Sequence, residues 1–284
     1  MRLTTKERGE GRKPISQSLD TAVVRFKGKN DITVDLVAAV HIGDKEYYEE
    51  LNQLFKQYDA VLYELVADKE ALKQHTAKKP KVGSKDESKN GSKSILSNFQ
   101  SGMGETLQLD FQLNCVDYSV KNFVHADLSP DEFAKRAAER GDFMQILFRA
   151  FLYGTKNASQ NKEIEMQAGL FSTLFASNPS LSLKRLFAKM MLEQMDDSMT
   201  ILTGGGSAII TDRNEAALKV LRKEIKKGKK KIAVFYGGGH LPEFTKELKD
   251  DFGMKPVSVK WIPAWDLTSD RSLRTRPAIT AGNE

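Results

Sequence analysis

Two segments far apart in the chain share one order of elements: a buried strand, a histidine, an amphipathic helix and a second strand. The first segment begins with residues 32–40, a β-rich run that leads directly into His41. Asp44 can then cap a helix, because residues 45–58 carry apolar side chains at three- and four-residue spacing on a single face. Residues 60–66, AVLYELV, follow as a run that is short and apolar enough for a buried parallel strand.

The second segment repeats this order near the C-terminus. Residues 231–236, KIAVFY, form a buried-type strand that runs into three glycines and His240. Pro242 suits a first helical position and Gly253 suits a helix end, after which residues 255–262, KPVSVKWI, predict another strand. The repeated order is typical of β-α-β crossover units, so we predict an α/β fold with a mixed, largely parallel sheet; an α+β arrangement is the alternative.

The remaining segments add to this sheet. Residues 21–27 form a β-rich run that a short turn joins to the first unit, which predicts a hairpin. Residues 142–199 follow helical periods and predict a helical layer inserted between the two units. We therefore expect one domain over residues 20–265, with flexible ends at 1–19 and 266–284.

A lysine-rich stretch carries much of the positive charge. The chain has a net charge of +6 and a pI near 9.1, and residues 76–94 alone carry six lysines against Asp86 and Glu87. This stretch has almost nothing apolar to bury, so we expect a disordered surface loop. Because no aromatic residues are interleaved with the lysines, a solvated loop is favoured over a nucleic-acid-binding arm, and no nucleic-acid partner is expected.

Cysteine use and hydropathy bound the environment of the protein. Cys115 is the only cysteine, which excludes an intramolecular disulfide and a thiolate-rich zinc cluster. The sequence has no uninterrupted apolar run of membrane-spanning length. We expect a soluble, cytoplasmic protein without a membrane span.

His41, His240 and Glu64 are the main candidates for chemistry. Each histidine ends a predicted buried strand just ahead of a helix, where open α/β sheets bind their ligands. A carboxylate at Glu64, within an apolar strand, is costly to bury without a cation or hydrogen-bond donors. We predict that the three side chains meet in one divalent-metal site, in which Glu64 is a ligand or the general base. The alternatives are two structural histidines and a glutamate exposed at the end of its strand.

Secondary candidates surround this site. Arg213 and Asn214 begin a predicted helix, and Arg213 could neutralise Glu64 or Asp127, or hold an anionic substrate group or transition state. A plain surface position is the alternative for Arg213. His125 and Asp127 also end a strand-like segment, although Asp127 could instead cap the next helix.

Several familiar sites are excluded by their motifs. The glycine runs at 204–207 and 237–240 lack the GKS or GKT ending of a phosphate-binding P-loop, and the chain has neither HExxH nor GxSxG. Gly237 and its neighbours more plausibly let the backbone approach a ligand beside His240.

Taken together, these motifs resemble the TraB, pheromone-shutdown and Tiki family, which is related more distantly to erythromycin esterases and ChaN-like proteins. That family is marked by two GxxH motifs and a glutamate. The matching residues are Gly237 and His240 for the second motif, Glu64 for the glutamate, and Arg213 with Asn214 for an ERN-like segment. In the first motif Ala38 stands where glycine is expected before His41. The resemblance covers roughly residues 20–262 and is thin in the helical middle.

The resemblance implies a metal-dependent hydrolase, as in Tiki, that cleaves peptide bonds with metal-activated water. It implies manganese or cobalt as the ion, with zinc as an alternative, held by His41, Glu64 and His240. Arg213 would then steady the anionic intermediate, and the substrate would be a peptide or another small molecule. Two other functions fit the same residues: a non-catalytic regulatory protein that binds a peptide or cofactor, and a metal-free esterase with a histidine general base.

Deleting residues 76–94 tests the loop prediction. Because the segment has so little to bury, the deletion should shift the thermal unfolding midpoint by less than about 4 °C, measured by calorimetry. A larger fall would show that the segment is a structural element.

Overall fold

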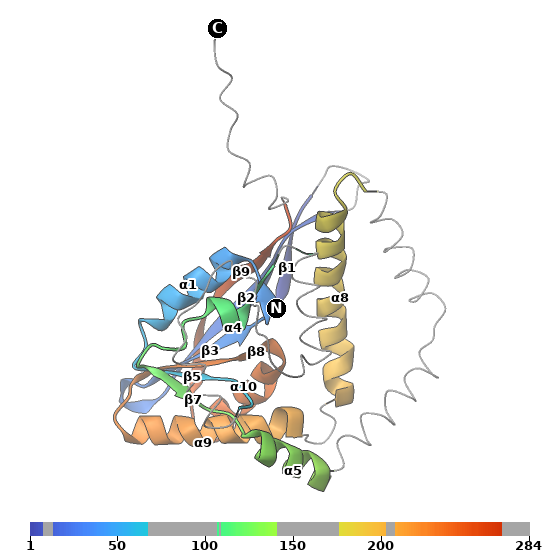
Figure 1. Cartoon of the computed structure of the whole chain (residues 1–284). Helices are drawn as coiled ribbons and strands as arrows, with labels where there is room; N and C mark the ends of the chain where they lie inside the picture. Colours follow the sequence, from blue (N-terminus) through green and yellow to red (C-terminus); the bar gives the residue numbers. More distant parts are fainter. Residues whose placement is uncertain (8–13, 68–106, 108, 141–175, 203–207, 269–284) are drawn as a thin grey trace.

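A computed structural model describes residues 1–7, 14–67, 107, 109–140, 176–202 and 208–268, and a seven-stranded mixed sheet forms its centre (Figure 1). The predicted loop at 76–94 and most of the predicted helical insertion, residues 141–175, lie outside the described residues. The sheet contains β1 (Arg2–Lys6), β2 (Ile15–Lys27), β3 (Thr33–Ala39), β5 (Ala60–Tyr63), β7 (Phe123–His125), β8 (Lys231–Gly237) and β9 (Lys255–Asp266).

Strand β2 organises the antiparallel half of the sheet. β1 and β3 pair with successive parts of one edge of β2, and β9 pairs along the other edge. The order then continues from β3 through β8 and β5 to β7, and these four strands are parallel. A second, two-stranded sheet joins β4 (Ile42–Gly43) to β6 (Asp110–Phe111).

The two crossover units run in opposite directions from neighbouring strands. From β3, the chain passes through α1 (Lys45–Phe55) to β5, beyond β8. From β8, it passes through α10 (Leu241–Asp250) to β9, beyond β3 and β2. The α/β fold and the repeated order of strand, histidine, helix and strand are therefore confirmed.

Helices cover both faces of the sheet. On one face, Leu51 and Phe55 of α1 join Phe235 in an apolar core, which is extended by α8 (Pro179–Leu202). On the other face, α9 (Arg213–Lys226) and α10 pack Leu221 and Phe244 against the opposite side of the same strands. The alternation of strand side chains between these two cores explains why β8 reads as a continuous apolar run. The remaining described helices are α4 (Gln112–Cys115), α5 (Pro130–Arg140), η1 (Lys29–Asp31), η2 (Ala208–Asp212, a π-helical turn) and η3 (Gly238–His240).

The predicted flexible ends are corrected by the structure. Residues 2–6 form β1 and β2 begins at Ile15, so part of the predicted flexible segment 1–19 belongs to the sheet. This pairing rests on backbone hydrogen bonds and on Arg2, which bonds to Asp20 at 3.0 Å and lies 4.3 Å from the ring of Trp261. None of these contacts requires an apolar run, which is why the sequence pattern misses them. At the other end Leu267 is fully buried, so the domain extends past the predicted boundary at 265.

Asp44 also differs from its predicted role. It precedes α1 but makes no side-chain cap. Its Oδ1 instead accepts a hydrogen bond of 2.8 Å from Lys184 of α8, and its Oδ2 accepts one from the backbone of Asp266. Asp44 therefore joins three segments, and α8 supplies one described part of the predicted helical layer. No described helix is long and apolar enough to cross a membrane.

A buried ion pair in β3 provides a test of the fold. Asp35 is 1% exposed, receives two hydrogen bonds from Arg25 at 2.8 and 2.7 Å, and accepts one from the Tyr58 hydroxyl at 2.6 Å. Asp35→Ala strands that buried hydroxyl and should lower the free energy of unfolding by about 3 kcal/mol, whereas Tyr58→Phe should cost only about 1 kcal/mol. Urea unfolding measures both, and equal losses would contradict the central position of Asp35.

Candidate active site

The carboxyl ends of the four parallel strands gather the predicted site residues along one edge of the sheet. His41 follows β3, Glu64 follows β5, Asp127 follows β7 and His240 follows β8. Because the two crossovers leave β3 and β8 in opposite directions, the ends of these strands form the switch point at which open α/β sheets bind ligands.

Glu64 is held from two sides at this edge. Its Oε2 accepts a 2.6 Å hydrogen bond from the backbone N–H of Gly237, and its Oε1 lies 2.7 Å from Nη2 of Arg213. The side chain is only 11% exposed. Burial raises the pKa of Glu64, but three groups outweigh burial and place the pKa below its ordinary value: His240, once acid has protonated it, the guanidinium of Arg213, and the N–H of Gly237. The carboxylate is therefore ionised at neutral pH.

Gly237 lies in close contact with the Glu64 carboxylate. A Cβ atom there would lie 3.3 Å from Oε2 of Glu64 and 3.8 Å from Cδ2 of His240. The predicted close approach of the backbone is thus present, and its described partner is the Glu64 carboxylate.

Arg213 lies between two carboxylates. Its Nε and Nη2 bond to Oδ1 and Oδ2 of Asp127 at 3.0 and 2.6 Å, while Nη2 also reaches Glu64. The Asp127 side chain is fully buried and that of Arg213 is 13% exposed, so the surface alternative for Arg213 is wrong. Both predicted ion pairs of Arg213 are present. One guanidinium is shared by two carboxylates, so the three side chains together keep a net negative charge, which could attract a further cation.

His240 is oriented by Asn214. The ring Nδ1 lies 2.7 Å from Oδ1 of Asn214, whose amide nitrogen donates to Oε2 of Glu243 at 3.1 Å. This amide orientation assigns the ring hydrogen to Nδ1 and leaves the lone pair on Nε2. Burial is the main reason that the pKa of His240 falls to about 4, since the charges of Glu64 and Arg213 act in opposite directions. The ring is therefore neutral at neutral pH.

Two hydrogen-bond acceptors consequently face one another. Nε2 of His240 lies 3.6 Å from Oε1 of Glu64, too far for a direct hydrogen bond. Two ligands of one tetrahedral ion are separated by about 3.4 Å when each lies near 2.1 Å from the metal. The pair thus fits two ligands of a divalent ion, or two acceptors for the hydrogens of one water.

His41 is less closely integrated. It is exposed, and its Nδ1 lies 3.2 Å from Oε1 of Gln112. The amide Nε2 of Gln112 donates a hydrogen bond of 2.8 Å to the Tyr118 hydroxyl. Among the described residues, no three His, Cys, Asp or Glu side chains are arranged to hold a metal ion. The shared shell of His41, Glu64 and His240 is therefore not pre-assembled, and it stays a prediction.

His125 contacts the segment that carries Glu64. Its Nε2 lies 2.7 Å from the carbonyl oxygen of Leu65, and its ring meets that of Tyr63 edge-on. These contacts hold the segment that carries Glu64, which is a structural role.

Sequence reasoning missed Glu243 and Gln112. Glu243 lies in the first turn of α10, three residues after His240, and accepts hydrogen bonds from Asn214 and Thr211. Its three-residue spacing from His240 places it about one helical turn away, so the sequence could have indicated that the two side chains lie close together. The residues before Gln112 show no strong periodicity in their apolar side chains. The sequence therefore did not indicate that Gln112 pairs with His41.

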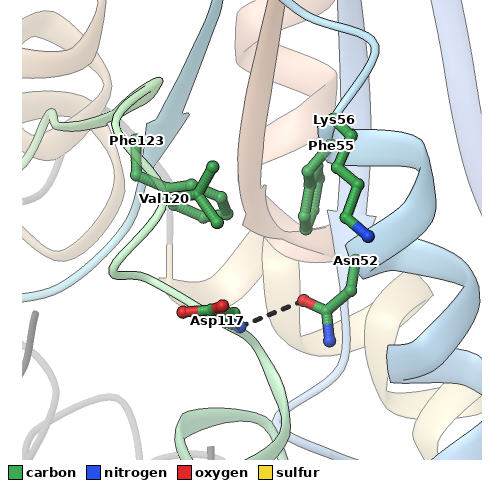
Figure 2. Close-up of a pocket in the computed structure, with 6 residues that line it drawn as sticks. All are labelled: Asn52, Phe55, Lys56, Asp117, Val120 and Phe123. Carbon is green, nitrogen blue, oxygen red and sulfur yellow. Dashed lines mark hydrogen bonds between the residues drawn. The ribbon is translucent and has the colours of Figure 1, made fainter. Parts of the chain in front are cut away.

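A cavity among the described residues lies away from this site (Figure 2). It measures about 230 Å³ and is lined by Asn52, Phe55, Lys56, Asp117, Val120 and Phe123. Phe55 ends α1 and Phe123 begins β7, so this cavity opens at the amino ends of the strands and contains none of the predicted site residues.

Comparisons with known proteins add no family. No model of a known protein family matches the chain, and no curated protein matches it. The resemblance to the TraB and Tiki family therefore rests on the motifs alone.

The depressed pKa of His240 predicts a pH-dependent stability of the metal-free protein. Between the ordinary pKa of 6.5 and the lowered pKa of about 4, His240 is protonated in the unfolded chain and unprotonated in the folded protein. The free energy of unfolding should therefore fall as the pH drops through this interval, by about 3 kcal/mol, and this part of the slope should be absent in His240→Gln. Urea unfolding with a chelator present measures it, and identical pH profiles for the two proteins would contradict the buried neutral ring.

Proposed function

We propose that this protein is a hydrolase in which Glu64 and His240 bind and activate one water molecule. The observation that carries the proposal is the pair of facing acceptors, 3.6 Å apart, at the switch point of the sheet. A neutral imidazole and an ionised carboxylate so placed are suited to holding a water and accepting its proton.

Each side chain has a role that follows from its contacts. Glu64 accepts the proton from water, since its carboxylate is ionised and held in place by Gly237 and Arg213. Asn214 fixes the tautomer of His240, so the Nε2 lone pair stays directed at the site. Within the described part of the chain, Nε and Nη2 of Arg213 contact carboxylates, and we assign the two N–H groups on Nη1 to an anionic intermediate.

The residues also support the metal-dependent form of this proposal. Glu64 and His240 would hold a divalent ion, manganese or cobalt by family resemblance or else zinc, with His41 as a third ligand. A metal bound there lowers the pKa of its water and polarises a peptide carbonyl. Two features favour this form: Arg213 is one cation shared by the two carboxylates Asp127 and Glu64, and the Nε2 lone pair of His240 faces Glu64.

A metal-free esterase is the second candidate. It is favoured by Arg213, whose guanidinium already contacts the Glu64 oxygen that faces His240. In that case His240 takes the proton from water and Glu64 stabilises the imidazolium that forms.

Glu64→Gln tests the shared core of both forms. The amide keeps the shape but loses the charge and basicity, so hydrolysis of fluorogenic peptides or p-nitrophenyl esters should fall by roughly 10² to 10⁴. Glu50→Gln is the matched control, because Glu50 is exposed and its ion pair among the described residues is with Lys260 at 2.7 Å. Normal turnover in Glu64→Gln would remove Glu64 from the mechanism.

Elemental analysis separates the two forms. Under the metal-dependent form, His240→Ala and His41→Ala should each lose bound metal, and a chelator should abolish turnover. Full metal content in His41→Ala would remove His41 from the ligand set. Chelator-resistant ester hydrolysis would favour the metal-free form, and binding of peptide without any turnover would favour a regulatory protein.

A further inference from the structure

The end of the sheet opposite the candidate active site, which holds the amino ends of the parallel strands and the carboxyl end of β2, carries a row of lysines. In register, Lys255 of β9 pairs with Lys27 of β2, Lys27 pairs with Thr33 of β3, and Thr33 pairs with Lys231 of β8. Asp59 and Lys121, just before β5 and β7, continue the line. Six strands spaced about 4.8 Å apart make this edge roughly 24 Å wide.

Turns at the same end add further lysines. Lys226, Lys227, Lys229 and Lys230 lie where α9 ends and β8 begins, at the left of Figure 1. Lys29 of η1 and Lys56 after α1 complete a set of ten, which we call the basic end. All ten are exposed except Lys229 and Lys231, which are partly buried.

The carboxylates at the basic end do not neutralise it. Asp59 accepts the backbone N–H bonds of Lys230 and Lys231, both at 2.9 Å, and so engages peptide groups there. These N–H bonds are the main reason that the pKa of Asp59 is lowered, with the charges of nearby lysines adding to it. The other acids are Glu224, whose Oε1 accepts a 2.6 Å hydrogen bond from Lys227, Asp31, which lies 3.7 Å from Lys27, Asp117, Asp250, and Asp251, which pairs with Arg222. Ten lysines therefore face six acids.

The helix dipole explains only part of this charge. Lys226 and Lys227 lie at the carboxyl end of α9, where cations are ordinarily favoured. Lys27, Lys121 and Lys255 come from strands and a loop, where no such preference applies.

We propose that the basic end is a docking surface for an anionic phospholipid membrane. The neighbouring Arg222 is paired with Asp251, so lysines supply the exposed charge of the basic end, and lysine is a point charge on a flexible stem, which suits a fluid layer of headgroups. A nucleic-acid site would add arginine forks, exposed aromatic rings or helix N-termini to such lysines. The crossover helices α1 and α10 and the helix α9 all present their carboxyl ends here. Docking in this way places the candidate active site at the end of the molecule that faces away from the membrane, and it does not depend on the proposed hydrolase activity.

Vesicle sedimentation with the full chain tests the proposal. The protein should bind vesicles of phosphatidylcholine containing about one third phosphatidylserine, and should not bind phosphatidylcholine alone. Binding should be lost near 1 M salt, where the Debye length is only about 3 Å. No binding to the anionic vesicles would overturn the proposal.

Charge-neutralising variants locate the surface. The triple variant Lys121→Gln, Lys226→Gln and Lys230→Gln should weaken vesicle binding on the order of 100-fold, since each lysine near an anionic surface contributes about 1 kcal/mol. The matched control removes three lysines from other parts of the surface: Lys6→Gln, Lys45→Gln and Lys135→Gln. Equal losses in both variants would show a general charge effect and overturn the assignment. Fluorescence anisotropy with a duplex oligonucleotide completes the test, because duplex binding without vesicle binding would assign the surface to nucleic acid. Thermal unfolding of both variants verifies that they fold.

Discussion

The guanidinium of Arg213 is the contact on which the candidate site depends. It lies between a fully buried Asp127 and a nearly buried Glu64, and it joins the ends of β7 and β5 to the start of α9. Burial removes both carboxylates from water. The guanidinium offsets this loss of solvation and the repulsion between the two negative charges. The same contact keeps Glu64 ionised, and Glu64 in turn binds the backbone of Gly237, so one cation aligns three strand ends and the loop that carries His240. The free-energy cost of burying these charges is offset because each carboxylate oxygen of Asp127 and Glu64 has a hydrogen-bond donor.

Much of the fold was readable from periodicity, because the feature that defines it is local. Strand, histidine and amphipathic helix are each encoded by contiguous residues, and β3, α1, β8 and α10 all lie where their apolar spacing predicts. Glu64 and Arg213 were also predictable, since a charged residue beside an apolar strand or at a helix start requires a partner. Membership of the TraB and Tiki family stays a prediction, since no family model matches.

The parts that escaped prediction depend on partners distant in sequence. β1 is held by backbone pairing and by Arg2, and Asp44 exchanges its capping role for contacts to Lys184 and Asp266, which lie more than a hundred residues away. The site shows the same limit: Asn214 orients His240 through a single hydrogen bond, and Gln112 holds His41, whereas no spacing rule connects either pair. A sequence pattern reports what one element buries, but not which polar groups it meets.

The position of β8 within the sheet has a consequence for the order in which the protein assembles. β3 and β5 do not pair with each other, because β8, from residues 231–237, lies between them, and β2 gains its outer neighbour only from residues 255–266. During synthesis from the N-terminus, every element from β1 to α9 must leave the ribosome before the central strand β8 exists. Until then β3 and β5 expose unpaired, apolar edges, which are the kind of surface that chaperones recognise and that aggregates use. The central strand β8 and the outer strand β9 are thus the last strands to join the sheet, and His240 emerges with them.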